Sequence, residues 1–310
     1  MFISDTGGRR SSLDEITELA VWCETAGLAS GWVPYLPWSL DAFVALTAVG
    51  RATTRIELGT AVVPTYPFHP MAMARSALSV NAAIGGRLAL GIGPSHPSVI
   101  EGMYGYQYDR PARHTADYVA ALRRAFSLDG TAEAHGDFFD FRSMFDVPGA
   151  TPPQLLIAAL APRMLQLAGE QTDGTILWFA DETALESHVV PKLTAAAAAA
   201  GRTTPRIVSA MPTAVVDDEG AAREQAARAF ATYAQIPTYR RILDRGAGAN
   251  PADVVLAGSE RTVADRLRRW RDLGVTDVVA APFPVGGDRD ASLRRTREAL
   301  ATIAEDVGRS

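Results

Sequence analysis

The sequence of 310 residues contains only one cysteine, Cys23, and one lysine, Lys192. A lone cysteine forms no disulfide within the chain, and this composition favours a reducing, cytoplasmic compartment. Lys192 follows no glycine-rich loop, so a phosphate-binding lysine of the Walker type is excluded. With a single lysine in the chain, catalysis through a Schiff base is not expected either.

Long apolar runs and an excess of positive charge are also lacking. No run approaches the roughly 18 apolar residues of a membrane span, and the start of the chain lacks a signal-peptide core. The 30 basic and 35 acidic residues give a net charge of −5, which disfavours nucleic acid or an anionic membrane as a partner. Hydrophobic residues make up 47% of the chain, enough for the large core of a globular protein.

Motifs of zinc sites, hydrolases and dinucleotide-binding folds are missing as well. The five histidines show neither HExxH nor HxH spacing, and with one cysteine available we expect no metal site. The absence of GxSxG argues against an α/β-hydrolase. The run Gly91–His96 (GIGPSH) begins like a dinucleotide-binding fingerprint, but it ends in histidine and lies far from the N-terminus.

Short β-rich runs alternate with longer helical patterns along almost the whole chain. This alternation predicts an α/β fold, a (β/α)8 barrel, because each crossover is long enough to return the next strand in parallel. A doubly wound sheet is the alternative, but Gly7 and Gly8 do not match its glycine-rich first turn. We expect a single domain over residues 1–310. The expected strands are Ile56–Val63, Leu88–Ile92, Leu155–Ala159, Gly174–Trp178, Ile207–Val216 and Val275–Ala281, with Phe2–Ser4 and Gly31–Val33 as weaker candidates. The expected helices are Ser12–Ala26, Asp41–Arg51, Pro70–Ile84, Ala116–Leu128, Pro162–Gln171, Thr183–Ala200, Gly220–Tyr239, Glu260–Leu273 and Ser292–Asp306.

Two stretches, 104–117 and 129–153, interrupt this repeat and are rich in proline, glycine, aspartate and aromatic residues. Long excursions of this kind usually act as lids or binding loops, so we expect an insertion or lid over 104–153, with solvated decoration as the alternative. A second irregular stretch spans 246–254. His69 and His114 are expected at the surface.

The stretch from Ile56 to His96 predicts two neighbouring strands that each end in a loop of unusual composition. In a barrel, residues just past the C-terminal ends of the strands face the active site, which brings 60–64 and 93–96 to one face. Glycine at 91 and 93 leaves room for a flat ligand or, alternatively, for tight packing between adjacent strands. Ser95 and nearby backbone N–H groups are candidates to bind a polar ring edge or a phosphate.

Three groups of segments follow one another along nearly the whole chain in a recognisable order. The first comprises RIELGTAVV at 55–63, the helix at 70–83, and GRLALGIG at 86–93 with its Pro94–His96 continuation. The second is LLIAALAPRMLQLA at 155–168 with Asp173–Gly174, and the third covers 258–274 and 278–282. In this order they resemble the luciferase-like monooxygenase superfamily, in particular its branch of coenzyme F420-dependent oxidoreductases.

The resemblance implies a barrel of the bacterial luciferase type that binds a deazaflavin, coenzyme F420, or alternatively FMN, across the C-terminal ends of its strands. That family has a non-prolyl cis peptide behind the ring at the end of its third strand, which falls on Thr60–Val62 here. Arg163, Arg261 and Arg289 are candidates to bind the anionic tail. A cytoplasmic homodimer is expected. The residues expected to bind the cofactor are Trp38, Thr60, Ala61, Val62, Gly93, Pro94, Ser95, Ala159 and Arg163.

The sequence departs from some F420 enzymes of this group. Their Asp-His pair after the second strand is not matched, because Pro34 stands where the histidine belongs, although Trp38 is present. His96 replaces an acidic residue after the fourth strand, and the lysine after the sixth strand is missing. The remaining catalytic candidates are His96, with an ordinary pKa of about 6.5, and Tyr35. The alternative role of His96 is to orient its loop or the cofactor.

Three functions are compatible with this pattern. The first is an F420-dependent oxidoreductase, expected to transfer a hydride from the reduced deazaflavin to a C=C or C=N bond of a small metabolite. The second is an FMN-dependent two-component monooxygenase, and the third is a non-catalytic flavin-binding protein. The sequence alone does not identify the substrate.

Overall fold

The computed structural model describes residues 1–4 and 11–309, and the side chains of 307–309 are not considered. Gly7 and Gly8 therefore lie outside the described residues. The main sheet is parallel throughout, in the order β1-β2-β4-β7-β8-β9-β10, with β3 paired to β4 and β11 paired to β9. Its strands are β1 (Ser30–Val33), β2 (Glu57–Thr60), β3 (Val63–Pro64), β4 (Leu88–Gly93), β7 (Gln154–Ala158), β8 (Gly174–Trp178), β9 (Arg206–Val215), β10 (Leu256–Gly258) and β11 (Asp277–Pro282).

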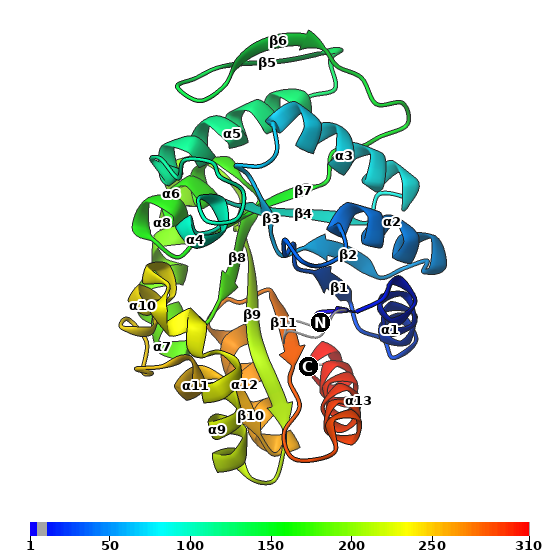
Figure 1. Cartoon of the computed structure of the whole chain (residues 1–310), viewed down its shortest axis with the longest axis vertical. Helices are drawn as coiled ribbons and strands as arrows, with labels where there is room; N and C mark the ends of the chain where they lie inside the picture. The colour runs from blue at the N-terminus through cyan, green and yellow to red at the C-terminus, as the bar shows by residue number, and fades with distance from the viewer. Residues whose placement is uncertain (5–10, 310) are drawn as a thin grey trace.

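The first residues of the chain close this sheet into a barrel. The backbone N–H of Ile3 donates to the carbonyl of Trp32 on β1 at 3.0 Å, and that of Phe2 donates to Ala280 on β11 at 2.9 Å. The segment 1–3 thus joins β1 to β11 and takes the position of the first of the eight barrel strands. The expected (β/α)8 barrel is confirmed (Figure 1).

Helices surround the barrel, and their first turns show why they begin where they do (Figure 1). Ser12 and Glu15 form the capping box of α1, while the Asp41 and Ser259 side chains accept backbone N–H groups at the starts of α2 and α12. The α-helices are α1 (Leu13–Thr25), α2 (Ala42–Ala52), α3 (Pro70–Ala83), α4 (Pro97–Ile100), α5 (Pro111–Ala125), α6 (Pro162–Gln171), α7 (Glu182–Ala184), α8 (Val190–Ala199), α9 (Glu219–Ala229), α10 (Pro237–Leu243), α11 (Pro251–Val254), α12 (Glu260–Asp272) and α13 (Arg289–Arg309). A π-helical turn, η1 (Leu185–Val189), precedes α8, and a 3-10 helix, η2 (Ala231–Gln235), precedes α10.

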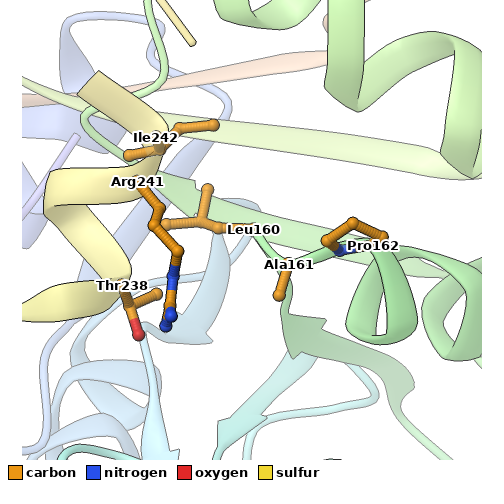
Figure 2. Close-up of a pocket in the computed structure, with 6 residues that line it drawn as sticks. All are labelled: Leu160, Ala161, Pro162, Thr238, Arg241 and Ile242. Carbon is orange, nitrogen blue, oxygen red and sulfur yellow. The ribbon is translucent and has the colours of Figure 1, made fainter. Parts of the chain in front are cut away.

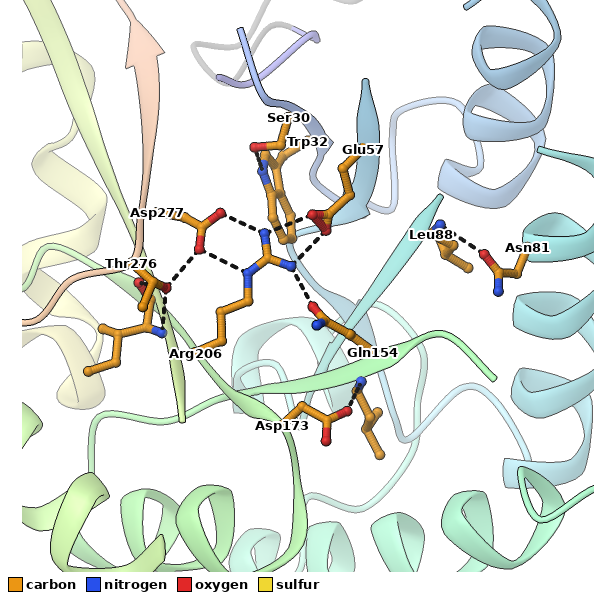
Figure 3. A network of polar contacts seen from close by, with 12 residues as sticks. Ser30, Trp32, Glu57, Asn81, Leu88, Gln154, Asp173, Arg206, Thr276 and Asp277 are labelled. Carbon is orange, nitrogen blue, oxygen red and sulfur yellow. Dashed lines mark hydrogen bonds and ion pairs between the residues drawn. The ribbon is translucent and has the colours of Figure 1, made fainter. Parts of the chain in front are cut away.

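A polar network fills the end of the barrel where the strands begin (Figure 3). The Arg206 guanidinium pairs with Glu57 at 2.7 Å and with Asp277 at 2.6 Å, and it donates to Gln154 at 2.6 Å. It also lies 5.7 Å from the ring centroid of Trp32, which is fully buried inside the barrel. This end is therefore occupied by the protein's own side chains, and a ligand must approach from the C-terminal ends of the strands.

The excursion expected between 104 and 153 contains more regular structure than its composition suggested. Helix α5 already begins at Pro111, and 129–153 holds an antiparallel hairpin of β5 (Thr131–His135) and β6 (Asp140–Met144). The hairpin lies outside the helical layer, next to α5 (Figure 1). The irregular interpretation of these residues was thus partly wrong. Proline at a first helical turn looks like a loop in sequence, and a two-stranded exposed hairpin has no strong apolar alternation.

His114 is buried, which corrects the expectation that it lies at the surface. Its side chain is 4% exposed, its Nε2 lies 3.1 Å from the Thr65 hydroxyl, and its ring stacks on Tyr66 at 3.8 Å. Burial lowers the pKa of His114 to about 4, although Asp117 partly raises it. The hairpin residues Phe138 and Phe139 pack against its ring, so part of the excursion over 104–153 shields this imidazole from water.

We expect His114 to make the protein sensitive to mild acid. The folded-state pKa of about 4 lies below the unfolded value of about 6.5, so the unfolded chain binds the proton first. Its contribution is fully present above pH 6.5 and is lost as the pH falls toward 4, amounting to about 2 kcal/mol of unfolding free energy by pH 5. Urea unfolding of His114→Gln at pH 7.5, 6 and 5 is expected to show a flatter pH dependence than the wild type.

The matched control is His135→Gln, because His135 is an exposed histidine of the hairpin, with 70% of its side chain accessible. This variant is expected to follow the wild-type pH dependence. If the unfolding free energies of His114→Gln and the wild type change with pH in the same way, the prediction is wrong, because the folded protein then tolerates protonation of His114.

Candidate active site

The C-terminal end of the barrel carries a small apolar floor. Ala61, Val62 and Trp178 pack on the side chains that fill the barrel interior and remain partly exposed above them. The peptide bond between Ala61 and Val62 is cis, within the stretch 60–62 where the sequence resemblance put it. Thr60, just below, is fully buried, and its hydroxyl donates to the Gly91 carbonyl at 2.8 Å and accepts from the Gly91 N–H at 2.9 Å. The Thr60 side chain therefore joins two strands and does not face the floor.

The two glycines of β4 are explained by packing. A Cβ at Gly91 would collide with the Thr60 carbonyl oxygen and the Ile176 side chain. A Cβ at Gly93 would lie 2.9 Å from Ala158 Cβ and 3.0 Å from Val62 Cγ2. Of the two interpretations of these glycines, close approach between barrel strands is the one that the contacts support.

The loop after β4 brings Pro94, Ser95 and His96 to the same end of the barrel, each of them half-buried. Ser95 has a φ of 60°, a left-handed conformation that is uncommon outside glycine, and its carbonyl accepts from the Tyr108 hydroxyl at 3.0 Å. The His96 ring lies 5.2 Å from the ring of Tyr239. Burial lowers the pKa of His96, so its imidazole is neutral at pH 7.

The two aromatic candidates after β1 differ in their surroundings. The Tyr35 hydroxyl donates to Asp41 at 3.0 Å, and its ring packs edge-on against Phe68 at 5.6 Å. Burial, together with Asp41, raises the pKa of Tyr35 above its usual range. Trp38 is 47% exposed. Tyr35 can transfer a proton to a ligand only if its hydrogen bond to Asp41 is exchanged. Of the two catalytic candidates, Tyr35 and His96, His96 is therefore the better placed.

A pocket of about 260 Å³ opens beside the C-terminal end of β7, between the start of α6 and helix α10 (Figure 2). Arg163, the second residue of α6, is exposed near it. Arg261 is the second residue of α12 and Arg289 the first of α13, and neither lines the pocket. Ala159 is 1% exposed and packs in the core outside the barrel, so its side chain does not line this pocket. The pocket is lined by Leu160, Ala161, Pro162, Thr238, Arg241 and Ile242.

The wall of this pocket is held from behind by a histidine that the sequence did not single out. His188 lies on the π-helical turn η1, is 2% exposed, and its Nε2 lies 2.8 Å from the Leu160 carbonyl oxygen. Burial lowers the pKa of His188, so the neutral ring is expected to donate this hydrogen bond. The π-turn therefore fixes the backbone at the mouth of β7.

Sequence reasoning also missed the segment that covers the barrel mouth, residues 231–243. It was predicted as the end of one helix running to Tyr239, but the helix is interrupted after α9 and again before Pro237. Tyr233 and Tyr239 from this segment face Trp178 and His96, at ring distances of 6.1 and 5.2 Å. The signal was present as the Ile236-Pro237 pair, since a residue before proline avoids helical geometry.

Two further observations concern the residues that the structure describes. Among them, no three His, Cys, Asp or Glu side chains gather closely enough to hold a metal ion. No helix within 1–4 and 11–309 combines the length and the apolarity needed to traverse a lipid bilayer.

Comparison with known proteins agrees with this architecture. Residues 2–277 match the family described as luciferase-like monooxygenase. An uncharacterised protein of Mycobacterium tuberculosis is 30% identical over 97% of this chain and 93% of its own length. The 5,10-methylenetetrahydromethanopterin reductase of Methanolobus tindarius is 25% identical, covering 90% of this chain and 93% of the reductase.

A solved structure extends the agreement to the fold. The F420-dependent secondary alcohol dehydrogenase in complex with an F420–acetone adduct superposes with a TM-score of 0.79 over 97% of this chain and 96% of that one, at 17% identity. That likeness concerns the fold alone. The family match over nearly the whole chain and the reductase that is similar over most of its length lead to one conclusion: this chain is an oxidoreductase that belongs to the luciferase-like monooxygenase family.

Proposed function

We propose that this protein is a coenzyme F420-dependent oxidoreductase that reduces a C=C or C=N bond of a small metabolite. The observation that carries the proposal is an uncharged, partly exposed floor at the C-terminal ends of the strands, bordered by a neutral histidine. Such a floor suits a flat, uncharged ring, and water excluded around it protects a hydride from loss. The methanogen reductase among the relatives agrees with a reductive direction.

The floor offers an apolar face and a hydrogen-bond donor for a deazaflavin ring. Ala61 and Val62 are small and partly exposed, so they suit the face of the ring. The indole N–H of Trp178 is buried, and within the described chain no hydrogen-bond acceptor meets it. A buried donor of this kind is costly to leave unpaired, and a carbonyl or ring nitrogen of the cofactor would satisfy it. When bound, the reduced deazaflavin supplies the hydride.

The pocket at α6 suits the anionic tail of the same cofactor. Thr238 and Arg241 line it from one side, and Arg163 lies in the first turn of α6. Helix α6 has no side-chain cap, so its first N–H groups are available to an anion. An arginine can bind a phosphate with two hydrogen bonds, which compensates for the lysine that the sequence lacks.

His96 would complete the reduction. One carbon of the substrate double bond receives the hydride with both electrons, its π bond breaks, and the other atom requires a proton. A neutral imidazole can relay that proton, accepting it from water at one ring nitrogen while donating from the other. The net result is a reduced substrate and a cofactor oxidised by two electrons.

The proposal is tested by anaerobic turnover with reduced F420 and a panel of unsaturated compounds. The expected result is substrate-dependent recovery of the oxidised deazaflavin absorbance without oxygen. Turnover that requires oxygen and reduced FMN would instead identify the alternative, an FMN-dependent two-component monooxygenase. Cofactor binding without turnover of any compound would favour the second alternative, a non-catalytic flavin-binding protein.

We also propose that the protein is a cytoplasmic homodimer. The support for the compartment is the single thiol, Cys23, which is free and buried and forms no disulfide. Burial also raises its pKa to about 11. Trp38 and Leu40 in the loop before α2, and Val44 in its first turn, are exposed large apolar residues, and burying them against a second copy would remove them from water.

Val44, 62% exposed, is the residue whose change is expected to separate the two subunits. Val44→Arg places charge in the proposed interface, and light scattering after gel filtration is expected to show a monomer where the wild type is a dimer. Val21→Arg, at an exposed apolar position on α1, is the control and is expected to remain dimeric. A monomeric wild type, or a dimeric Val44→Arg, would refute this interface.

A further inference from the structure

The segment 231–243 gives the barrel mouth an aromatic wall, which we define as His96, Phe179, Tyr233 and Tyr239. Trp178 of the floor borders this wall, with its ring 6.1 Å from that of Tyr233. The rings of Tyr233 and Tyr239 are 5.3 Å apart, and Phe179 lies 5.1 Å from the first and 5.8 Å from the second. Phe179 is fully buried behind them. The wall thus joins the loop after β4, the end of β8 and the covering segment into one surface above the floor.

Within the described residues, the hydroxyl groups of this wall have no hydrogen-bond partners. Tyr233 and Tyr239 are half-buried, yet no residue in the described part of the chain forms a hydrogen bond with either hydroxyl. Burial raises the pKa of both phenols, that of Tyr239 with a contribution from Tyr233, so both remain protonated donors. Neither hydroxyl oxygen is among the buried atoms of the described residues that lack a partner, so both reach the open mouth of the barrel and can donate to an acceptor on a ligand.

The two charged residues of the segment 231–243, both arginines, do not belong to the wall. Arg240 pairs with Asp244 at 3.0 Å, and Arg241 lines the pocket at α6, next to Leu160 (Figure 2). His96 is neutral because burial lowers its pKa. The wall is therefore free of charge at pH 7. No residue of the wall itself offers a countercharge to a phosphate or carboxylate that is placed against it.

From these contacts, and building on the proposed function, we infer the class of the substrate: an uncharged ring compound whose carbonyl is conjugated to the double bond being reduced. The ring packs against Tyr233, and the carbonyl oxygen accepts a hydrogen bond from the Tyr239 hydroxyl. Aromatic side chains provide large, flat apolar contacts, and a phenol donor strengthens its bond as charge develops on that oxygen during hydride addition. Tyr239 is thus a substrate-binding residue that selects enones over carboxylates.

Binding of two small six-membered-ring probes tests this inference. Cyclohexenone carries the inferred features, and cyclohexenecarboxylate replaces the neutral carbonyl group with an anion. Calorimetric titration, with and without oxidised F420, is expected to show cyclohexenone binding and cyclohexenecarboxylate binding at least about tenfold more weakly. In Tyr239→Phe the Kd for cyclohexenone is expected to rise about fivefold to tenfold, the effect of one lost hydrogen bond.

Tyr106→Phe makes the same chemical change at an exposed tyrosine, 51% accessible, and is expected to bind cyclohexenone like the wild type. Equal binding of the two probes, or an unchanged Kd in Tyr239→Phe, would overturn the inference. Failure of F420 to bind would instead refute the proposed function, and the titration without cofactor would still show whether Tyr239 selects neutral carbonyl compounds.

Discussion

Replacing His96 with alanine is expected to lower turnover by about tenfold or more while leaving the Kd for the cofactor nearly unchanged. A positioned acid-base group typically contributes two to four orders of magnitude, of which water can replace a part, so about tenfold is a minimum. The His96 ring lies at the mouth of the barrel beside Tyr239, and no described residue forms a hydrogen bond with its nitrogens. Its imidazole is therefore available for proton transfer and is not needed to hold the loop.

Steady-state kinetics combined with a cofactor titration of the same variant provide the measurement. His135→Ala, at an exposed histidine of the hairpin, is the control and is expected to retain wild-type turnover. His96→Gln separates the two roles of this residue, because glutamine keeps a hydrogen-bonding side chain but does not relay a proton. Recovery of turnover in His96→Gln, or unchanged turnover in His96→Ala, would remove His96 from the chemistry.

Gly91→Ala is expected to lower the free energy of unfolding by about 3 kcal/mol or more. The added methyl group would meet the Thr60 carbonyl oxygen and the Ile176 side chain inside the barrel, where the packed backbone has little room to move. For a protein of this size, such a loss corresponds to a decrease in Tm of about 5–10 °C. The floor is also expected to shift, because the new group lies 3.2 Å from Val62 Cγ1.

Calorimetric melting compares this variant with Gly287→Ala. The added methyl group at Gly287 has no neighbour within 4 Å and the backbone there is not left-handed, so its melting temperature is expected to match the wild type. A Gly91→Ala protein that melts like Gly287→Ala would contradict the close approach of β2 and β4. Normal stability with weakened cofactor binding would instead favour the ligand interpretation of this glycine.

The barrel was predictable from sequence because its strands are short apolar runs that end at turn residues. The predicted strand 174–178 and the predicted helix 162–171 match the structure residue for residue, and most other boundaries differ by one to three residues. The predicted strand at 56–63 is interrupted at Ala61–Val62, between β2 and β3. The interruption was expected only from the family resemblance, since small and β-branched residues there suit an ordinary strand equally well.

The parts that sequence did not reveal depend on contacts between distant segments. Nothing local distinguishes Tyr239 from a surface tyrosine of a helix until the break at Pro237 turns it toward His96. The buried position of His114 likewise results from Phe138 and Phe139, more than twenty residues away in a hairpin whose strands are largely half-buried or exposed. Periodicity reports burial within one element, and it does not report which elements meet.

Titration of the apoprotein with F420 and with FMN tests the central claim most directly. Calorimetry or fluorescence with oxidised and reduced forms is expected to show tight binding of F420 and weak binding of FMN. Trp178→Phe, which removes the unpartnered indole N–H, is expected to weaken F420 binding about threefold to tenfold. Tight binding of FMN with weak binding of F420, or binding of neither, would contradict the claim that this barrel uses a deazaflavin.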